Sequence, residues 1–359
     1  MTPLPPPPSG PLSPGTPAHS RKKADGAEGT ADVDGKAGQA DYWGTPHPAP
    51  APGTSPLPHP AVSGKTRLKD RLTLIGINAL MLAPYAWRVG LAGWVGRRIL
   101  ARTSSIRPRI RAALLHLFPD LPESEIARIC ARVPENMART AVEIVSGADF
   151  YAHAATSPVS GPGWEALQEA RRTGRPAVLL TAHYGNAAAV GAALKARGFV
   201  IGTFFKPMPD PAVNRFYTAA VEAVTSPLFP SGREGVAGMI RHLRGGGMLS
   251  ISFDLDRPNG VMLEFLGKPA RTVLSMAEMA LKYDALLVPV YGIRRDDGLH
   301  FDVFIDAPIP HGDPAAMTQA VNDSLGRMVT LHKDQWLWWH RRWKDDHPAD
   351  AAPPAGPEG

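Results

Sequence analysis

His183 is the residue of this 359-residue sequence whose position most favours chemistry. It directly follows the apolar run 177–182, which predicts a buried strand, and a helix is expected to begin just after it. Ligands bind at the carboxyl ends of strands in open α/β sheets, so His183 can face a cleft. Amides at the start of the following helix could hold developing negative charge there. The alternative is a histidine that only caps the helix.

The three residues after His183 also favour a binding site. They are Tyr184, Gly185 and Asn186. Gly185 would let the backbone approach a substrate closely, and Asn186 would cap the next helix. We therefore assign all three residues to substrate binding.

A second expected strand, 199–205, ends at Lys206 and Pro207. Lys206 could hold a phosphate or carboxylate of a substrate, and Pro207 follows it in the same loop. An ordinary solvated lysine is an equally good interpretation of Lys206 alone.

A third expected strand, 248–253, is followed by Asp254 and Asp256. These carboxylates could orient the histidine or bind a cation, or they could only form a turn, where aspartate is common. Polar residues at three successive strand ends are stronger evidence for a binding site than polar residues at any one of them. We therefore expect His183, Lys206 and Asp254 to share one cleft.

The surrounding pattern alternates between helix and strand from about residue 164 onward. Such alternation predicts an α/β fold with a mixed, mostly parallel sheet covered by helices. Before it, residues 104–150 are expected to form two helices separated by Pro119 and Pro122, the second capped near Ser124. The later helices are expected at 164–173, 187–197, 211–223, 232–244, 272–283 and 315–332. A further strand is expected at 286–293, with 300–305 as its hairpin partner.

The two ends of the chain differ in composition from the rest. Of the 38 prolines, 15 lie in the first 60 residues, among Gly, Ala and Ser. Such a segment cannot bury enough apolar surface to offset its ordering entropy. We expect disorder at 1–62 and at 345–359, and one folded domain at 63–344.

The basic residues surround an apolar segment. The net charge is +6, and Lys and Arg flank the apolar run 72–87 on both sides. This arrangement favours a membrane surface over nucleic acid as the acidic partner. The run is short for a spanning helix. We therefore interpret the run as an interfacial helix or a hairpin-like dip, within a helical, membrane-associating part at 63–111 that places Trp87 and Trp94 at the interface. A buried core helix is the alternative.

Two other features have simple interpretations. The single cysteine, Cys130, excludes an internal disulfide and a zinc site built from cysteines, and it is expected to be a buried apolar residue. The segment 336–343 is rich in Trp and Arg. It fits a lipid interface and, equally, a packing segment whose tryptophans cover the sheet.

Several blocks of this sequence resemble, in order, those of the lipid A biosynthesis acyltransferases of the lysophospholipid acyltransferase superfamily. The resemblance spans residues 70–344 and includes His183-Tyr-Gly-Asn, Lys206-Pro, Asp254, Phe265-Leu-Gly-Lys-Pro-Ala and the end 335–344. It implies a lauroyl- or myristoyl-type transferase at the cytoplasmic face of the bacterial inner membrane. The implied donor is acyl carrier protein, or acyl-CoA, and the acceptor is a lipid A precursor or related lipid. No cofactor, metal or nucleic acid is implied.

One position departs from the family pattern. The family has Asp or Glu five positions after the histidine, where this chain has Ala188. The resemblance makes His183 the general base, and Asp254 or Asp256 could supply the missing carboxylate. We assign catalysis to His183 and Asp254, and we add Lys206, Pro207 and Asp256 to the substrate-binding residues. The alternative is a catalytically lapsed homologue that binds lipid or acyl chains as a partner or regulatory protein.

Overall fold

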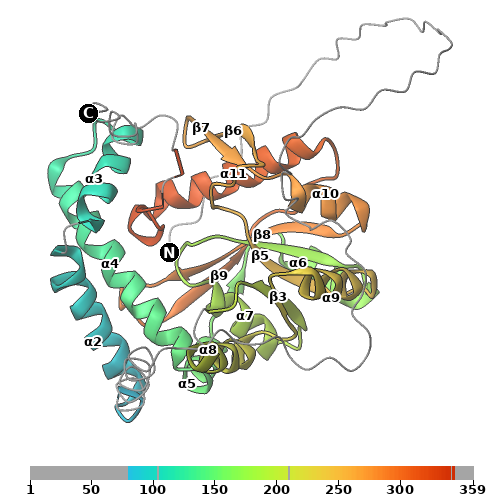
Figure 1. Cartoon of the computed structure of the whole chain (residues 1–359), viewed down its shortest axis with the longest axis horizontal. Helices are drawn as coiled ribbons and strands as arrows, with labels where there is room; N and C mark the ends of the chain where they lie inside the picture. Colours follow the sequence, from blue (N-terminus) through green and yellow to red (C-terminus); the bar gives the residue numbers. More distant parts are fainter. Residues whose placement is uncertain (1–79, 103–104, 209–210, 341, 344–359) are drawn as a thin grey trace, which may run out of the picture. The chain divides into compact units, whose positions relative to one another are not determined.

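A seven-stranded sheet forms the centre of the molecule (Figure 1). The computed structural model describes residues 80–102, 105–208, 211–340 and 342–343. The strand order is β1-β9-β8-β2-β5-β3-β4, and every neighbouring pair is parallel except the hairpin β8–β9. The strands are β1 (Val159–Ser160), β2 (Ala177–Thr181), β3 (Ile201–Phe205), β4 (Leu228–Pro230), β5 (Met248–Ser252), β8 (Leu286–Arg294) and β9 (Phe301–Ile305).

Helices cover both faces of this sheet because β2 alternates its side chains between two apolar cores. Ala177 and Leu179 belong to a core with α6 (Trp164–Thr173) and α7 (Ala187–Ala196). Val178 and Leu180 belong to the opposite core, with α9 (Arg233–Arg244), α10 (Ser275–Lys282) and α11 (Pro314–Leu331). The predicted α/β fold with a mixed, mostly parallel sheet is confirmed. Helix α8 (Pro211–Val224) packs against α7.

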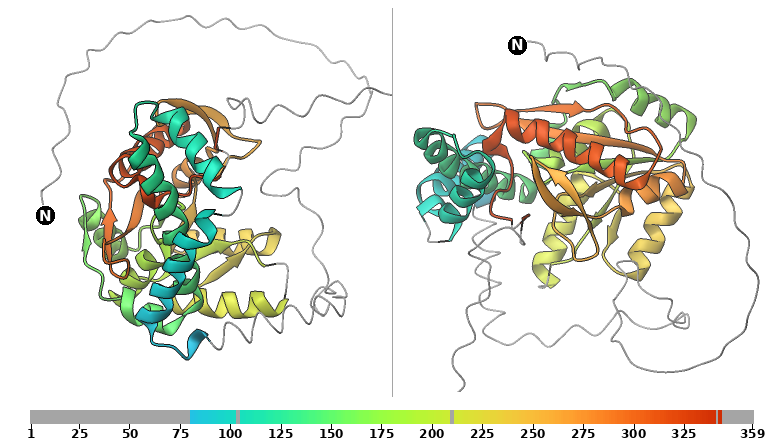
Figure 2. Two further views of the ribbon diagram at one scale, coloured as in Figure 1. Left: turned by 90° about the vertical axis from the view of Figure 1, so that its left-hand side faces the viewer. Right: turned by 90° about the horizontal axis from the view of Figure 1, so that it is seen from above.

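The segment before the sheet is a helical arm. It comprises α2 (Tyr85–Arg98), η1 (Leu100–Arg102), α3 (Ile106–Leu117), α4 (Glu123–Val145) and α5 (Ala148–Ala154). In the left view of Figure 2 these blue-to-green helices lie in front of the sheet. Helices α2 and α4 pack closely, since a Cβ on Gly96 would lie 2.3 Å from the carbonyl oxygen of Pro134.

One prediction for this arm needs correction, because of a proline. Ser124 does not cap α4: Pro122 holds the N-cap position, without a side-chain hydrogen bond, because its fixed φ suits a helix start. In the run 72–87, expected as an interfacial helix or a hairpin-like dip, residues 80 and 81 are helical and α2 begins after Pro84. Residues 72–79 of that prediction, and the disorder predicted for 1–62 and 345–359, lie outside the described residues.

The remaining described elements are a small hairpin and the C-terminal segment, which comprises residues 333–340 and 342–343. Strands β6 (Val261–Phe265) and β7 (Lys268–Thr272) are joined by Leu266 and Gly267, both with positive φ, as a two-residue hairpin turn requires. After η2 (Lys333–Gln335), Trp336, Trp338 and Trp343 are buried. The packing interpretation of these tryptophans is therefore the correct one. Cys130 is buried as expected.

Candidate active site

His183 and Asp254 form a hydrogen-bonded pair at the carboxyl ends of two neighbouring strands. Strands β2 and β5 are parallel, and Thr181 lies opposite Ser252 in their register. Each of the two site residues stands two positions beyond its strand, so the register brings them together. His183 Nδ1 lies 2.8 Å from Asp254 Oδ1, and the His183 backbone N–H donates to Asp254 Oδ2 at 2.9 Å.

The carboxylate of Asp254 is buried and fully engaged. Its Oδ2 also accepts a hydrogen bond from the indole N–H of Trp336 at 3.0 Å. Burial by itself would raise the pKa of Asp254, but the charge of His183 and the hydrogen bonds from His183 and Trp336 outweigh it and lower that pKa. Asp254 is therefore ionised at neutral pH.

The same pairing defines the state of the histidine. Burial would lower the pKa of His183, but the charge and hydrogen bond of Asp254 outweigh it, so that the pKa is raised. Because Nδ1 faces a carboxylate, it carries the proton in the neutral ring, which leaves Nε2 as the acceptor. The side chain is 38% exposed. His183 can therefore accept a proton from a bound molecule.

The C-terminal segment holds the backbone around His183 through two hydrogen bonds. Leu337 N–H donates to the carbonyl of His183 at 3.1 Å, and Gly185 N–H donates to the carbonyl of Gln335 at 2.8 Å. The ring of His340 lies 5.9 Å from that of His183. The sequence analysis treated this end as one aromatic, basic segment and did not assign Trp336 or His340 to the site. A tryptophan needs an acceptor for its indole N–H when it is buried, and this need is the signal that could have pointed to Trp336.

Tyr184 and Gly185, predicted to bind substrate, contact the protein interior instead. Tyr184 is buried, and its hydroxyl donates to the carbonyl of Met328 at 3.2 Å. Gly185 has φ +56°, and a Cβ there would lie 2.0 Å from the carbonyl oxygen of Gly292 on β8. The glycine is thus required for a close approach to β8, which corrects the prediction that it serves approach to a substrate.

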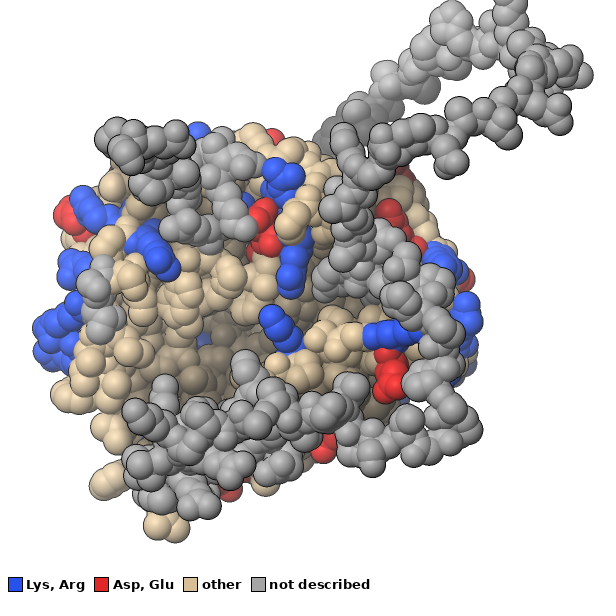
Figure 3. Space-filling model, viewed as in Figure 1, with Lys and Arg blue, Asp and Glu red and all other residues tan. Residues whose placement is uncertain are grey.

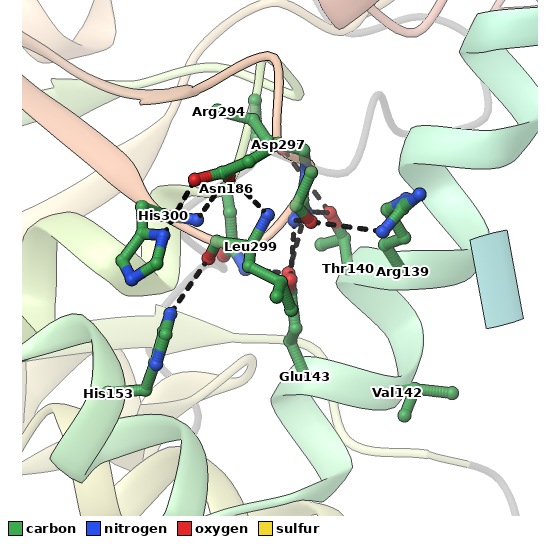
Figure 4. A network of polar contacts seen from close by, with 12 residues as sticks. Arg139, Thr140, Val142, Glu143, His153, Asn186, Arg294, Asp297, Leu299 and His300 are labelled. Atoms are coloured by element: carbon green, nitrogen blue, oxygen red, sulfur yellow. Dashed lines mark hydrogen bonds and ion pairs between the residues drawn. The ribbon is translucent and has the colours of Figure 1, made fainter. Parts of the chain in front are cut away.

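Asn186 caps α7 as predicted, and it also joins a buried polar network (Figure 4). Its Oδ1 accepts from the Ala188 N–H at 2.9 Å, and its Nδ2 donates to Glu143 Oε2 at 2.8 Å. Glu143 in turn pairs with the buried Arg294, whose Nη2 also donates to Thr140 at 2.9 Å. Asn186 therefore ties the start of α7 to α4 and β8.

The amides at the start of α7 are mostly occupied. The N–H groups of Gly185, Asn186, Ala188 and Ala189 donate to Gln335, Gly292 and the Asn186 oxygens. The expectation that the amides at this helix start stabilise an oxyanion is therefore corrected for these four groups.

Lys206, Pro207 and Asp256 follow strands β3 and β5, which pair in parallel, and their sharing of one cleft with His183 stays a prediction. Lys206 is exposed at the end of β3, which is separated from β2 by β5. Two strand spacings, about 10 Å, separate β3 from the strand of His183, and only one separates it from the strand that leads to Asp254. Asp256 lies 3.9 Å from Arg271 on β7.

Ala188 packs away from the histidine. It lies against an apolar cluster that includes Phe150 and Ala154 of α5. In this chain the carboxylate that contacts the imidazole comes from β5, and not from α7. In the described part of the chain, no three His, Cys, Asp or Glu residues are placed to hold a metal ion.

The fold and this pair define an α/β protein with an acid-oriented histidine at its strand ends. Residues 62–345 match the family described as bacterial lipid A biosynthesis acyltransferase. The chain belongs to this family, and the resemblance seen in the sequence is confirmed.

Individual relatives carry two kinds of name. A phosphatidylinositol mannoside acyltransferase of Mycobacterium tuberculosis (strain H37Rv) is 27% identical over 51% of this chain and 60% of its own length. The chain thus spans less than two thirds of that relative. A lipid A biosynthesis acyltransferase of Haemophilus influenzae is 20% identical over 74% of this chain and 85% of its own length. A phosphatidylinositol mannoside acyltransferase of Mycolicibacterium smegmatis is 23% identical over 79% and 96%.

Proposed function

We propose that this protein transfers a fatty acyl group from an acyl thioester to a hydroxyl of a membrane lipid. The observation that carries the proposal is the 2.8 Å contact of His183 Nδ1 with the buried Asp254, which leaves Nε2 as a base. Family membership over residues 62–345 supports it.

In the proposed reaction, His183 Nε2 removes the proton from the acceptor hydroxyl as its oxygen attacks the thioester carbonyl. A general base of this kind contributes about 10²–10⁴ in rate. The tetrahedral intermediate then collapses, the C–S bond breaks, and the proton on Nε2 passes to the thiolate. Asp254 holds the ring in the correct tautomer and stabilises its cation throughout.

The acceptor and the donor are proposed from the relatives and the residues together. The relatives' names point to lipid A and to phosphatidylinositol mannoside. We therefore propose a hydroxyl of a lipid A precursor or a related lipid, with Lys206 holding an acceptor phosphate. Acyl carrier protein is the proposed donor carrier, with acyl-CoA as the alternative.

We further propose that the protein works at the cytoplasmic face of the inner membrane. Helix α2 exposes Trp87 (76%), Leu91 (53%) and Trp94 (55%) at helical spacing, followed by Arg97 and Arg98. Within the described residues, every helix is too short or too polar to cross a bilayer. Co-sedimentation with anionic vesicles tests the membrane contact of α2. The double variant Trp87→Ser, Trp94→Ser should bind the vesicles much more weakly than wild type. Unchanged vesicle binding would refute this contact.

The lapsed-homologue alternative is based on Ala188. The contact of Asp254 with His183 supplies a carboxylate by another route, so we favour an active enzyme.

Mass spectrometry of the lipid product tests the acyl transfer. The full chain is incubated with acyl-carrier-protein or acyl-CoA thioester and each of the two lipid acceptors. Wild type should form acylated lipid and His183→Ala should not. Thioester hydrolysis without lipid product, or equal product from both proteins, would refute the transferase proposal.

A further inference from the structure

A basic cavity lies in the helical arm, built from residues that the proposed reaction does not use. Its volume is about 310 Å³. Four arginines line it, Arg97 and Arg98 from α2, Arg102 from η1 and Arg107 from α3, together with Cys130 and three alanines. The small alanine side chains leave the space that the cavity occupies. Figure 3 shows Lys and Arg gathered on the left edge, where these helices meet.

The electrostatics of this cavity favour an anion. Among the described residues, the lining contains no acidic side chain. Arg97 is 54% exposed and lies 3.4 Å from Glu135, but Arg132 and Arg139 pair with the same carboxylate. Arg132 also lies 3.4 Å from Asp334, so two carboxylates face three arginines and an excess of positive charge remains.

The start of α3 adds to this field. Arg107 stands in its first turn, which holds no acidic residue, and Ser105 at the N-cap position makes no side-chain cap. The positive end of a helix dipole attracts anions, and phosphate above all. Arginine matches phosphate geometry with parallel N–H donors.

The surroundings indicate what carries the anion. Trp94 is 55% exposed and precedes Arg98 by four positions, on the same side of α2. Ile99 and Leu100, in the same connection, are 50% and 36% exposed. Exposed apolar side chains beside a phosphate-sized basic cavity suit a ligand with a phosphate and acyl chains.

We propose that the cavity lined by Arg97, Arg98, Arg102 and Arg107 binds the phosphate of an anionic lipid headgroup, at a site separate from His183. The bound headgroup fixes the arm at a defined position on an anionic membrane. Non-specific basic attraction would give no defined position.

Titration calorimetry of the full chain, without any acyl donor, tests this independently of catalysis. The probes are dihexanoyl phosphatidic acid below its micelle concentration, dihexanoyl phosphatidylcholine and inorganic phosphate. We expect phosphatidic acid to bind at least tenfold more tightly than either of the others. Equal affinity for inorganic phosphate would overturn the lipid assignment, and no binding of phosphatidic acid would overturn the site.

The matched variants are Arg107→Gln and Arg109→Gln, which remove the same charge from one helix. Arg109 is exposed and does not line the cavity. Arg107→Gln should weaken phosphatidic acid binding about tenfold or more, as loss of a charge-assisted hydrogen bond does, and Arg109→Gln less than twofold. Equal losses would refute a defined site.

Two further measurements complete the test. Arg98→Gln repeats it at a second lining position, so that misfolding of one variant does not decide the outcome. Binding of acyl carrier protein is measured in parallel. Loss of that binding in Arg107→Gln with unchanged phosphatidic acid binding would assign the cavity to an acidic protein and overturn the proposal.

Discussion

Trp336 and Asp254, which lie 82 positions apart in the sequence, are joined by a hydrogen bond from the indole N–H to the buried carboxylate. The accepting oxygen is the one that also takes the backbone N–H of His183. Through Trp336, the C-terminal segment thus holds Asp254, the carboxylate that orients His183, in one defined position.

Substituting Asp254 with Asn tests the oriented pair. The amide cannot stabilise the imidazolium and can hold the wrong tautomer. We expect kcat for acyl transfer to fall by about 10⁴, as in a serine-protease triad that loses its carboxylate. Asp302→Asn is the control, because Asp302 pairs with Arg295 on the β8–β9 hairpin, and its kcat should change less than threefold. Similar losses in both variants would argue against a special role for Asp254.

The pH dependence of transfer follows from the raised pKa of His183. The ring acts as a base only when neutral, so kcat/KM should fall as the pH falls through that pKa. Asp254 raises it against the effect of burial, so the midpoint should lie above the ordinary value of about 6.5. In Asp254→Asn the midpoint of the residual activity should move down. A midpoint that stays in place in this variant would contradict the coupling.

Restoring the family's acid at position 188 should gain little. Asp254 already contacts the imidazole, and Ala188 packs against the apolar cluster with Phe150. We expect Ala188→Glu to change kcat less than threefold and to lower the melting temperature, because a carboxylate is placed against apolar groups. Ala188→Gln adds a side chain of the same size as Glu but without the charge, so the two variants together separate the effect of charge from that of size. A gain in kcat of about 10⁴ for Ala188→Glu, without a gain for Ala188→Gln, would show that Asp254 does not orient the His183 imidazole.

Trp336→Phe keeps an aromatic ring and removes the indole donor. Asp254 then loses one hydrogen bond to its charged form, so its pKa should rise and the fold should lose about 2 kcal/mol. We expect kcat to fall about tenfold, which corresponds to 1.4 kcal/mol. Trp338→Phe is the control, since that indole donates to the carbonyl of Lys333. If kcat falls equally in both variants, packing rather than the hydrogen bond explains the effect.

Gly185→Ala tests the close approach to β8 by chemical denaturation. Gly174 provides the comparison: its φ is +70°, and a Cβ there meets nothing within 4 Å. Gly174→Ala should cost only the left-handed backbone strain, about 1–2 kcal/mol. Gly185→Ala adds a contact of 2.0 Å with the Gly292 carbonyl, so its loss should be clearly larger. Equal losses would mean that the loop can move away from β8.

The sequence alone determined the elements and the order of the strand ends. Helix α6 has the bounds predicted, and β2 and β5 differ from their predictions by one residue each. Periodicity works here because burial repeats every two residues on a strand and every 3.6 on a helix. The importance of His183 and Asp254 followed from their positions after buried strands.

Only the tertiary structure decided which of these residues meet. The register of β2 with β5 places Asp254 on His183, and strand register depends on pairing that local periodicity does not encode. The inward direction of Tyr184 and Gly185 depends on α11 and β8, more than 100 positions away in the sequence. Trp336 reaches Asp254 only because the C-terminal segment packs back over the sheet. Contacts between residues so far apart in the chain leave no local pattern in the sequence.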